Sequence, residues 1–330
     1  MVTRKLSGKQ FTVWLLAGLT AIAALGYFAG NLAVKRVDDQ FYAKETLAVE
    51  LASQSVREAL RLPASQLYSV VNLEPRMLQA LNSRDGNLSE IENAFITLLL
   101  RNPNYAQVRW ISEDGMEIVR VDQKRPGVVR AKEADALQDK SRRPYVQQGL
   151  QLQKDQLYVS PLDLNMENGE IQIPYMPVVR MALRAYGNDG RPRGLIVLNI
   201  AAGPMLDQVR NYSATENIML LNAEGYWLKS ANPADEWGFM LGNTATMGTR
   251  HPRAWQKINT SASGYAETQS GLWTWQTIEA SENHLSVAHN LELKLVAQVS
   301  RENLTGARLK ALAPILITIA ATAVFYAVAL

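Results

Sequence analysis

The sequence lacks cysteine altogether and contains only three histidines among its 330 residues. The absence of cysteine excludes disulfide bonds, thiolate metal sites and a cysteine nucleophile, and it suits an oxidising compartment. His251, His284 and His289 have spacings that fit no familiar metal-binding or zincin motif, and no GxSxG, P-loop or GxGxxG motif follows an expected strand. We therefore predict no catalytic residue, no metal ligand and no cofactor, and a protein that is not an enzyme.

A strong excess of charge of either sign is also lacking. The 34 Lys and Arg residues nearly balance the 31 Asp and Glu residues, which gives a net charge of +3 and a pI near 9.0. The cations are scattered along the chain, so we exclude nucleic acid as a partner. With 47% hydrophobic residues, the chain is long enough for two compact domains with a buried core.

Two segments contain no charged residue at all, residues 11–34 and residues 311–330. Each is long enough to span a bilayer as a helix, which takes about 20 apolar residues. The alternative for the first segment is a cleaved signal peptide, but the apolar part of such a peptide is usually only about 7 to 15 residues long. We predict that residues 1–34 form a cytoplasmic tip and a first transmembrane helix, and residues 301–330 a connecting helix and a second one.

The part between the spans begins with a helical pattern. Residues 35–62 contain good helix formers without Gly or Pro, and apolar residues recur at helical spacing at Val49, Ala52 and Val56. We expect a helix of about 50 residues that begins inside the first span. Residues 35–103 are therefore assigned to this long signalling helix and further helical segments.

The texture then changes to short strands joined by turns. Residues 105–122 alternate between apolar and polar on both sides of Asp114 and Gly115, which predicts a hairpin with a two-residue turn. Residues 178–186 and 194–201 predict a second hairpin. Together they indicate an antiparallel sheet of about five strands, of the PAS type, over residues 104–205.

The same pattern returns with an offset of 110 residues. Gly225 falls on Gly115, and strands that begin at Gly271 and end at Ser300 match the closing hairpin. We predict a second, similar sheet domain over residues 206–300. The expected fold class is thus α+β, with two PAS-like antiparallel-sheet lobes in tandem on a long N-terminal helix, flanked by two transmembrane helices.

The first hairpin also predicts a binding site. Counted outward from the turn, Arg109 faces Arg120 and Gln107 faces Asp122, and like charges that face each other across strands are destabilising. Two explanations stay open: a solvated face on which Asp122 and other carboxylates answer the arginines, or an anionic group of a ligand held by the pair together with Arg180.

The repeat favours a site in the first domain only. At the offset of 110 residues, Met219 and Ser230 stand where the first domain has Arg109 and Arg120. The hairpin can therefore fold without this pair of cations.

Four stretches carry a resemblance to a known family: VRWISEDGMEIVRVD, LQDKSRRPY, YVSPLDLNMENGEIQIPYMPVVRMA and GRPRGLIVLNI. They resemble the double Cache sensor domains that precede diguanylate cyclases, histidine kinases and chemoreceptors in bacterial transmembrane receptors. The resemblance implies a small-molecule ligand in the membrane-distal lobe and a homodimer formed through the long N-terminal helices. It further implies an inner-membrane location with residues 35–307 in the periplasm, and output through the second transmembrane helix. The chain itself is then expected to be a fragment, or a receptor cut at the membrane, without its cytoplasmic output domain.

Carried over by position, the pocket of this family is expected to involve seven residues once Asp122 is added beside the arginine pair. These residues are Arg109, Arg120, Asp122, Tyr145, Tyr158, Asp163 and Arg180. Two other functions remain as alternatives: a membrane-tethered periplasmic hydrolase, and a module whose tandem lobes bind a protein partner.

Overall fold

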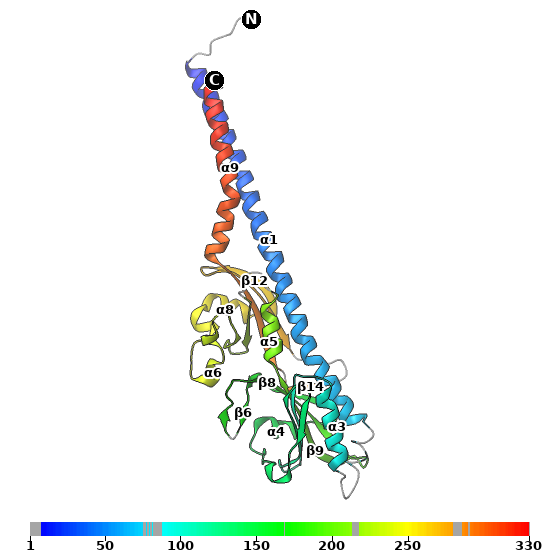
Figure 1. Ribbon diagram of the computed structural model, residues 1–330. Coiled ribbons are helices and arrows are strands. Elements are labelled where there is room, and N and C mark those ends of the chain that lie inside the picture. Colours follow the sequence, from blue (N-terminus) through cyan, green and yellow to red (C-terminus); the bar gives the residue numbers. More distant parts are fainter. Residues whose placement is uncertain are drawn as a thin grey trace. The chain divides into compact units, whose positions relative to one another are not determined.

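The structure of the protein is a computed structural model (Figure 1), which describes residues 8–74, 77, 79, 81, 88–167, 169–212, 218–279, 286–289 (backbone only) and 291–329. The chain divides into two compact units. Unit 1 comprises Met1–Leu47, Tyr265–Thr274 and Gln298–Leu330, and unit 2 comprises Ala48–Gly264 and Trp275–Ala297.

Both predicted spans lie in long helices, α1 (Gly8–Asn72) and α9 (Arg301–Ala329). These are the two described helices that are long and apolar enough to cross a membrane. Within unit 1 they run antiparallel, because the Tyr326 hydroxyl donates to the Trp14 carbonyl at 2.6 Å while Arg308 Nε donates to Asp38 Oδ1 at 2.8 Å. The chain therefore leaves the helix pair and returns to it at the same end, as expected for two spans that bracket one domain. Leu330 lies outside the described residues.

Helix α1 is longer than the predicted 50 residues, since it continues through Pro63 to Asn72. Proline inside a helix removes one hydrogen bond and crowds the preceding turn. Here Leu60, Ala64 and Leu67, on both sides of the proline, are buried in one core cluster, and this burial offsets the loss.

The first sheet contains eight strands in the order β14-β4-β8-β9-β1-β2-β3, with β5 paired to β8. Its strands are β1 (Tyr105–Ile111), β2 (Glu117–Arg125), β3 (Val128–Ala131), β4 (Gln156–Val159), β5 (Asp163–Leu164), β8 (Pro177–Tyr186), β9 (Pro192–Ala201) and β14 (Ser286–His289). It is larger than the predicted sheet of about five strands. The printed pairs are antiparallel except for β14, which adds to β4 in parallel.

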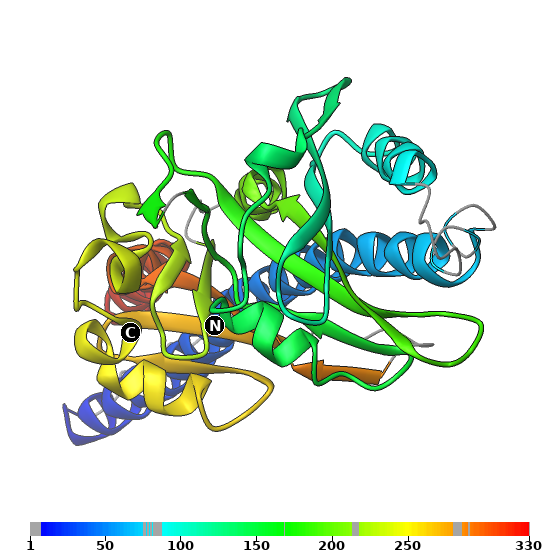
Figure 2. The ribbon, with the colours of Figure 1, turned by 90° about the horizontal axis from the view of Figure 1, so that it is seen from below.

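The two faces of this sheet are covered differently (Figure 2). Val108, Val121 and Leu198 point to one face and pack in the main core cluster with residues of α1 and of α3 (Leu88–Leu100), such as Phe95. On the other face, Tyr145 and Val146 of α4 (Pro144–Gly149) pack on a smaller apolar cluster that consists of Ile111, Leu152, Tyr158, Ala182, Leu195 and Val197. The remainder of that second face is polar.

The second sheet has the strand order β11-β10-β15-β13-β12. Its strands are β10 (Ile218–Asn222), β11 (Trp227–Lys229), β12 (Ser263–Thr268), β13 (Gly271–Glu279) and β15 (Glu292–Ser300). The shorter elements are η1 (Ala134–Ala136), β6 (Met166–Glu167), β7 (Glu170–Ile171), α5 (Gly203–Arg210), η2 (Pro233–Asp235), α6 (Gly238–Leu241), α7 (Met247–Arg250) and α8 (Pro252–Ile258). A long N-terminal helix, two mainly antiparallel sheets and an apolar C-terminal helix confirm the predicted fold class.

Candidate ligand-binding site

A row of polar residues crosses four adjacent strands on the second face of the first sheet. In the strand registers, Arg180 of β8 faces Asn199 of β9, Asn199 faces Gln107 of β1, and Gln107 faces Asp122 of β2. The predicted pairing of Gln107 with Asp122 is thus confirmed. Arg180, Asn199 and Gln107 are between 2% and 8% exposed, so this is a buried polar row and not an open surface.

A second row lies beside it and contains the predicted arginine pair. Arg109 of β1 faces Arg120 of β2, and both side chains are 7% exposed. This confirms the predicted register at the centre of the hairpin. Buried cations need partners, because an isolated charge in a protein interior is strongly unfavourable.

The partner of Arg109 is Glu117, a residue that the sequence analysis did not find. The predicted two-residue turn at Asp114 and Gly115 is wrong. The Ser112 amide instead donates to the Met116 carbonyl at 2.8 Å, and a bulge makes Ile111 face Glu117.

Because a bulge inserts one extra residue, it turns Glu117 onto the face of Arg109. The carboxylate lies 3.4 Å from Arg109 Nε and is fully buried. Gly115, with φ +93°, was the available signal, since longer hairpin loops place a glycine in the left-handed region next to a bulge.

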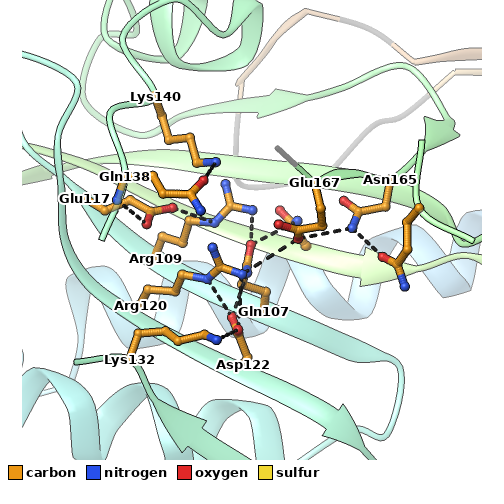
Figure 3. Close-up of polar contacts among 12 residues, drawn as sticks. Gln107, Arg109, Glu117, Arg120, Asp122, Lys132, Gln138, Lys140, Asn165 and Glu167 are labelled. Carbon is orange, nitrogen blue, oxygen red and sulfur yellow. Dashed lines mark hydrogen bonds and ion pairs between the residues drawn. The ribbon is translucent and has the colours of Figure 1, made fainter. Parts of the chain in front are cut away.

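Arg120 is held by Asp122 in a bidentate pair (Figure 3). Its Nε donates to Oδ1 at 2.9 Å and its Nη2 to Oδ2 at 3.1 Å, while Gln107 Nε2 donates to Oδ1 at 2.6 Å and Lys132 Nζ lies 3.4 Å from Oδ2. Burial alone would raise the pKa of Asp122, but the hydrogen bonds from Arg120 and Gln107 outweigh it and hold this pKa below its ordinary value. Asp122 is therefore a carboxylate whose acceptor positions are filled.

Tyr145 links the other two predicted arginines. Arg109 Nη1 donates to its hydroxyl at 2.6 Å, and the guanidinium carbons of Arg109 and Arg180 lie 5.8 and 5.5 Å from its ring centre. Arg180 Nη1 donates to Asp163 Oδ1 at 2.7 Å. Burial raises the pKa of Asp163, and the neighbouring Arg180 opposes this only in part. Each predicted arginine is thus paired with a carboxylate.

Tyr158 was predicted at the site but packs in an apolar cluster, whereas Lys140 lies beside the network and was not predicted. The buried ring of Tyr158 lies under α4, and burial raises its pKa. Lys140 is 8% exposed and donates to Gln138 Oε1. Burial lowers the pKa of Lys140, and the positive charge of Arg109 lowers it further.

A cleft of about 230 Å³ opens over the polar row. Of the seven predicted residues only Arg120 and Asp122 line it, and Asn199 and Glu167 are among the lining residues that were not predicted. Glu167 lies on the short β6–β7 hairpin at the rim, with Oε1 3.7 Å from Arg120 Nη2. The structure therefore separates the predicted set into an open part around Arg120 and a closed part around Tyr145.

Metal binding finds no support in the part of the chain that the structure describes, where no group of three His, Cys, Asp or Glu side chains could hold an ion. His284 lies outside the described residues, and only the backbone of His289 is described.

The fold is that of bacterial sensor domains found outside the cytoplasm. The extracellular domain of vpHK1S-Z8, assigned as a histidine kinase, is 19% identical with a TM-score of 0.66, over 84% of this chain and 95% of that one. A domain of a protein assigned to the sensory box/GGDEF family of Vibrio parahaemolyticus is 18% identical with a TM-score of 0.66, over 83% and 99%. The periplasmic sensory domain of the Campylobacter jejuni chemoreceptor Tlp1 is 10% identical with a TM-score of 0.60, over 81% and 98%.

Residues 54–288, more than two thirds of the chain, match the family described as the sensor domain of bacterial histidine kinases, and the chain belongs to that family. No curated protein matches the chain. The predicted resemblance to Cache-type sensor domains of kinases, GGDEF proteins and chemoreceptors is thereby confirmed. The chain is a bacterial sensor domain with two candidate membrane helices.

Proposed function

We propose that this chain is the ligand-sensing part of an inner-membrane receptor, which acts by binding and not by catalysis. Residues 35–307 lie in the periplasm, residues 104–205 form the membrane-distal lobe that binds a small molecule, and residues 206–300 form the membrane-proximal lobe. The observation that carries this proposal is the cleft above the buried polar row. Concave sites with a few converging polar groups are typical of small-molecule binding.

Binding is transmitted by a change in the β6–β7 hairpin and the first sheet. A ligand that contacts Arg120 from the cleft competes with Glu167 at the rim and favours one arrangement of the hairpin over another. Strand β15 ends at Ser300 and α9 begins at the next residue, Arg301, so no loop absorbs movement before the second span. The output domain that receives this movement is a histidine kinase, a diguanylate cyclase or a chemoreceptor signalling segment.

The receptor acts as a homodimer through α1. Leu51 and Leu62 are 42% and 44% exposed and stand 11 residues apart, which is about three helical turns, so they lie on one face. Exposed apolar side chains in line on a long helix favour contact with a second copy. Because the chain has no cysteine, Leu51→Cys gives a unique thiol, and we expect oxidation in membranes to produce a covalent dimer. A chain that stays monomeric under these conditions contradicts this part of the proposal.

The ligand site is tested with residues 1–330 in lipid nanodiscs, by thermal shift against a panel of small metabolites. Metabolites that raise the unfolding midpoint of the native chain are then measured with Arg120→Ala and with Arg125→Ala. Arg125 lies on the same strand but is exposed and does not line the cleft, so its variant is the matched control. We expect the shift to vanish in Arg120→Ala and to persist in Arg125→Ala. If the thermal shift persists in Arg120→Ala, the ligand binds somewhere other than this cleft.

A further inference from the structure

The acceptor positions of Asp122 determine how the neighbouring amides are oriented. Its two oxygens receive Arg120, Gln107 and Lys132, and a carboxylate can only accept hydrogen bonds. Gln107 must therefore present its Nε2 to Asp122 and its Oε1 to the opposite side. There Oε1 accepts from Arg109 Nη2 and, at 3.4 Å, from Asn199 Nδ2.

This orientation leaves one acceptor over. With its Nδ2 turned to Gln107, Asn199 points its Oδ1 the other way, and this buried atom has no hydrogen-bond partner among the residues that the structure describes. Asn199 is 2% exposed and lines the cleft. A buried acceptor without a partner is unfavourable, so a group that enters the cleft with an N–H or O–H donor is favoured.

A donor is left over on the other side. Arg120 uses Nε and Nη2 for Asp122, and its Nη1 makes no hydrogen bond within the described part of the chain. Since the charge of Arg120 is already matched by Asp122, Nη1 can serve a neutral carbonyl oxygen as well as a carboxylate.

The remaining lining is neutral in sum and rich in amides. Arg120 and Lys124 balance Asp122 and Glu167, which leaves no excess charge to attract an ion. Five lining residues carry a carboxamide: Gln107, Gln123, Asn165, Gln172 and Asn199. Carboxamides both donate and accept hydrogen bonds, so they match an uncharged polar group better than an anion or a cation.

Resting on the proposed function, we infer that the ligand of this cleft is a small uncharged molecule that carries a carboxamide or ureide group. Its carbonyl oxygen accepts from Arg120 Nη1, and its N–H donates to Asn199 Oδ1. The cleft volume of about 230 Å³ lies below the range of about 300 to 1,000 Å³ of drug-sized pockets, which restricts the ligand to a few atoms beyond this group.

The test measures the binding of four probes of nearly equal size to the full chain in nanodiscs. Binding is detected by ligand-observed NMR at pH 7. Propionamide and methylurea carry the proposed group, propionate carries a charge, and propane-1,2-diol carries hydroxyls. We expect the amide and the urea to bind about 5- to 10-fold more tightly than propionate or the diol, which is the effect of one additional hydrogen bond.

Two variants of Asn199 test the acceptor. Asn199→Leu removes Oδ1 while keeping a similar side-chain volume, and it is expected to weaken the binding of propionamide about 5- to 10-fold. Asn199→Asp keeps the shape and adds a negative charge, so it remains informative if the leucine variant does not fold, and it is expected to shift the preference to propylammonium. Gln147→Leu, an exposed amide on α4, is the control and should bind like the native chain.

The outcomes separate this inference from the function that it rests on. Tighter binding of propionate or the diol that is lost in Arg120→Ala overturns the amide assignment but leaves the cleft as the sensor site. Amide binding that is unchanged in both Asn199→Leu and Arg120→Ala overturns the assignment and the site together. If none of the probes binds while a metabolite from the panel does so in an Arg120-dependent way, only the amide assignment fails.

Discussion

The two hairpins at the start of the two sheets have one backbone and different side chains. In β1–β2, Trp110 faces Val119 and Ile111 faces Glu117 across a bulge; at the offset of 110 residues, β10–β11 has the same two pairs and the same bulge. The turns match too, because Gly115 and Gly225 have φ values of +93° and +85°.

The side chains on the second face of the sheet differ together between the two hairpins. Where the first hairpin has Arg109 and Glu117 as a buried ion pair, the second has Met219 and Trp227, both at least nine-tenths buried. An apolar pair can replace a buried ion pair of similar volume at little cost in stability. The comparison teaches that this backbone can form the hairpin and its bulge without the charged pair.

The largest expected effect comes from replacing only one member of the buried ion pair in the first hairpin. Arg109→Met alone leaves the fully buried Glu117 carboxylate without its cation, and we expect a loss of about 3 to 5 kcal/mol in the free energy of unfolding. Arg109→Met combined with Glu117→Gln removes both charges and should recover most of that loss. Denaturant unfolding of Arg109→Met, of Glu117→Gln and of the double variant measures the coupling, and strictly additive losses would contradict it.

The next effect tests the two turns against each other. Gly115→Ala places a methyl group at positive φ and about 2.5 Å from the Cα atom of Ser141, whereas at Gly225 the new atom meets only the Trp255 ring at 3.1 Å. We expect Gly115→Ala to cost about 3 kcal/mol and Gly225→Ala about 1 kcal/mol. Thermal unfolding of both variants checks the order, and equal losses would show that backbone strain alone decides.

A smaller effect concerns pH, because Asp122 corresponds to Asn232 at the same offset. The pKa of Asp122 is held below its ordinary value in the folded state, so the unfolded chain binds more protons there and stability rises with pH. This contribution is complete above the ordinary pKa near 4 and is lost as pH falls through the lowered folded value.

Asp122→Asn should therefore remove about 2 kcal/mol at pH 7 and flatten the acid side of the curve of stability against pH. Unfolding midpoints between pH 3 and pH 7 measure this. If stability falls as steeply at acid pH in the variant as in the native chain, the pH dependence comes from other carboxylates.

The smallest expected effect is that of Arg120→Ser, which copies Ser230 of the second hairpin. Asp122 keeps Gln107 and Lys132 as partners, so we expect a loss of about 1 kcal/mol in stability, well below that of Arg109→Met. Ligand-induced thermal shifts should vanish in the same variant. A stability loss as large as that of Arg109→Met would make Arg120 a structural residue.

Much of this architecture was predictable because it follows from local sequence patterns. Charge-free runs identify both candidate membrane helices, and the alternation on both sides of Gly115 identifies the hairpin and places Arg109 opposite Arg120. Such patterns depend on neighbours within a few residues or on simple periods of 2 and 3.6, so one sequence is enough to find them.

Long-range contacts decided the rest. One bulge turned Glu117 toward Arg109, Ser286 of β14 paired with Gln156 of β4 across the chain, and α4 drew Tyr158 into an apolar cluster away from the cleft. The leftover acceptor of Asn199 likewise follows from a chain of hydrogen-bond partners on the three strands β2, β1 and β9. Which partner a buried polar group finds depends on residues far apart in sequence, because burial forces each group to be paired by whatever the packing brings near.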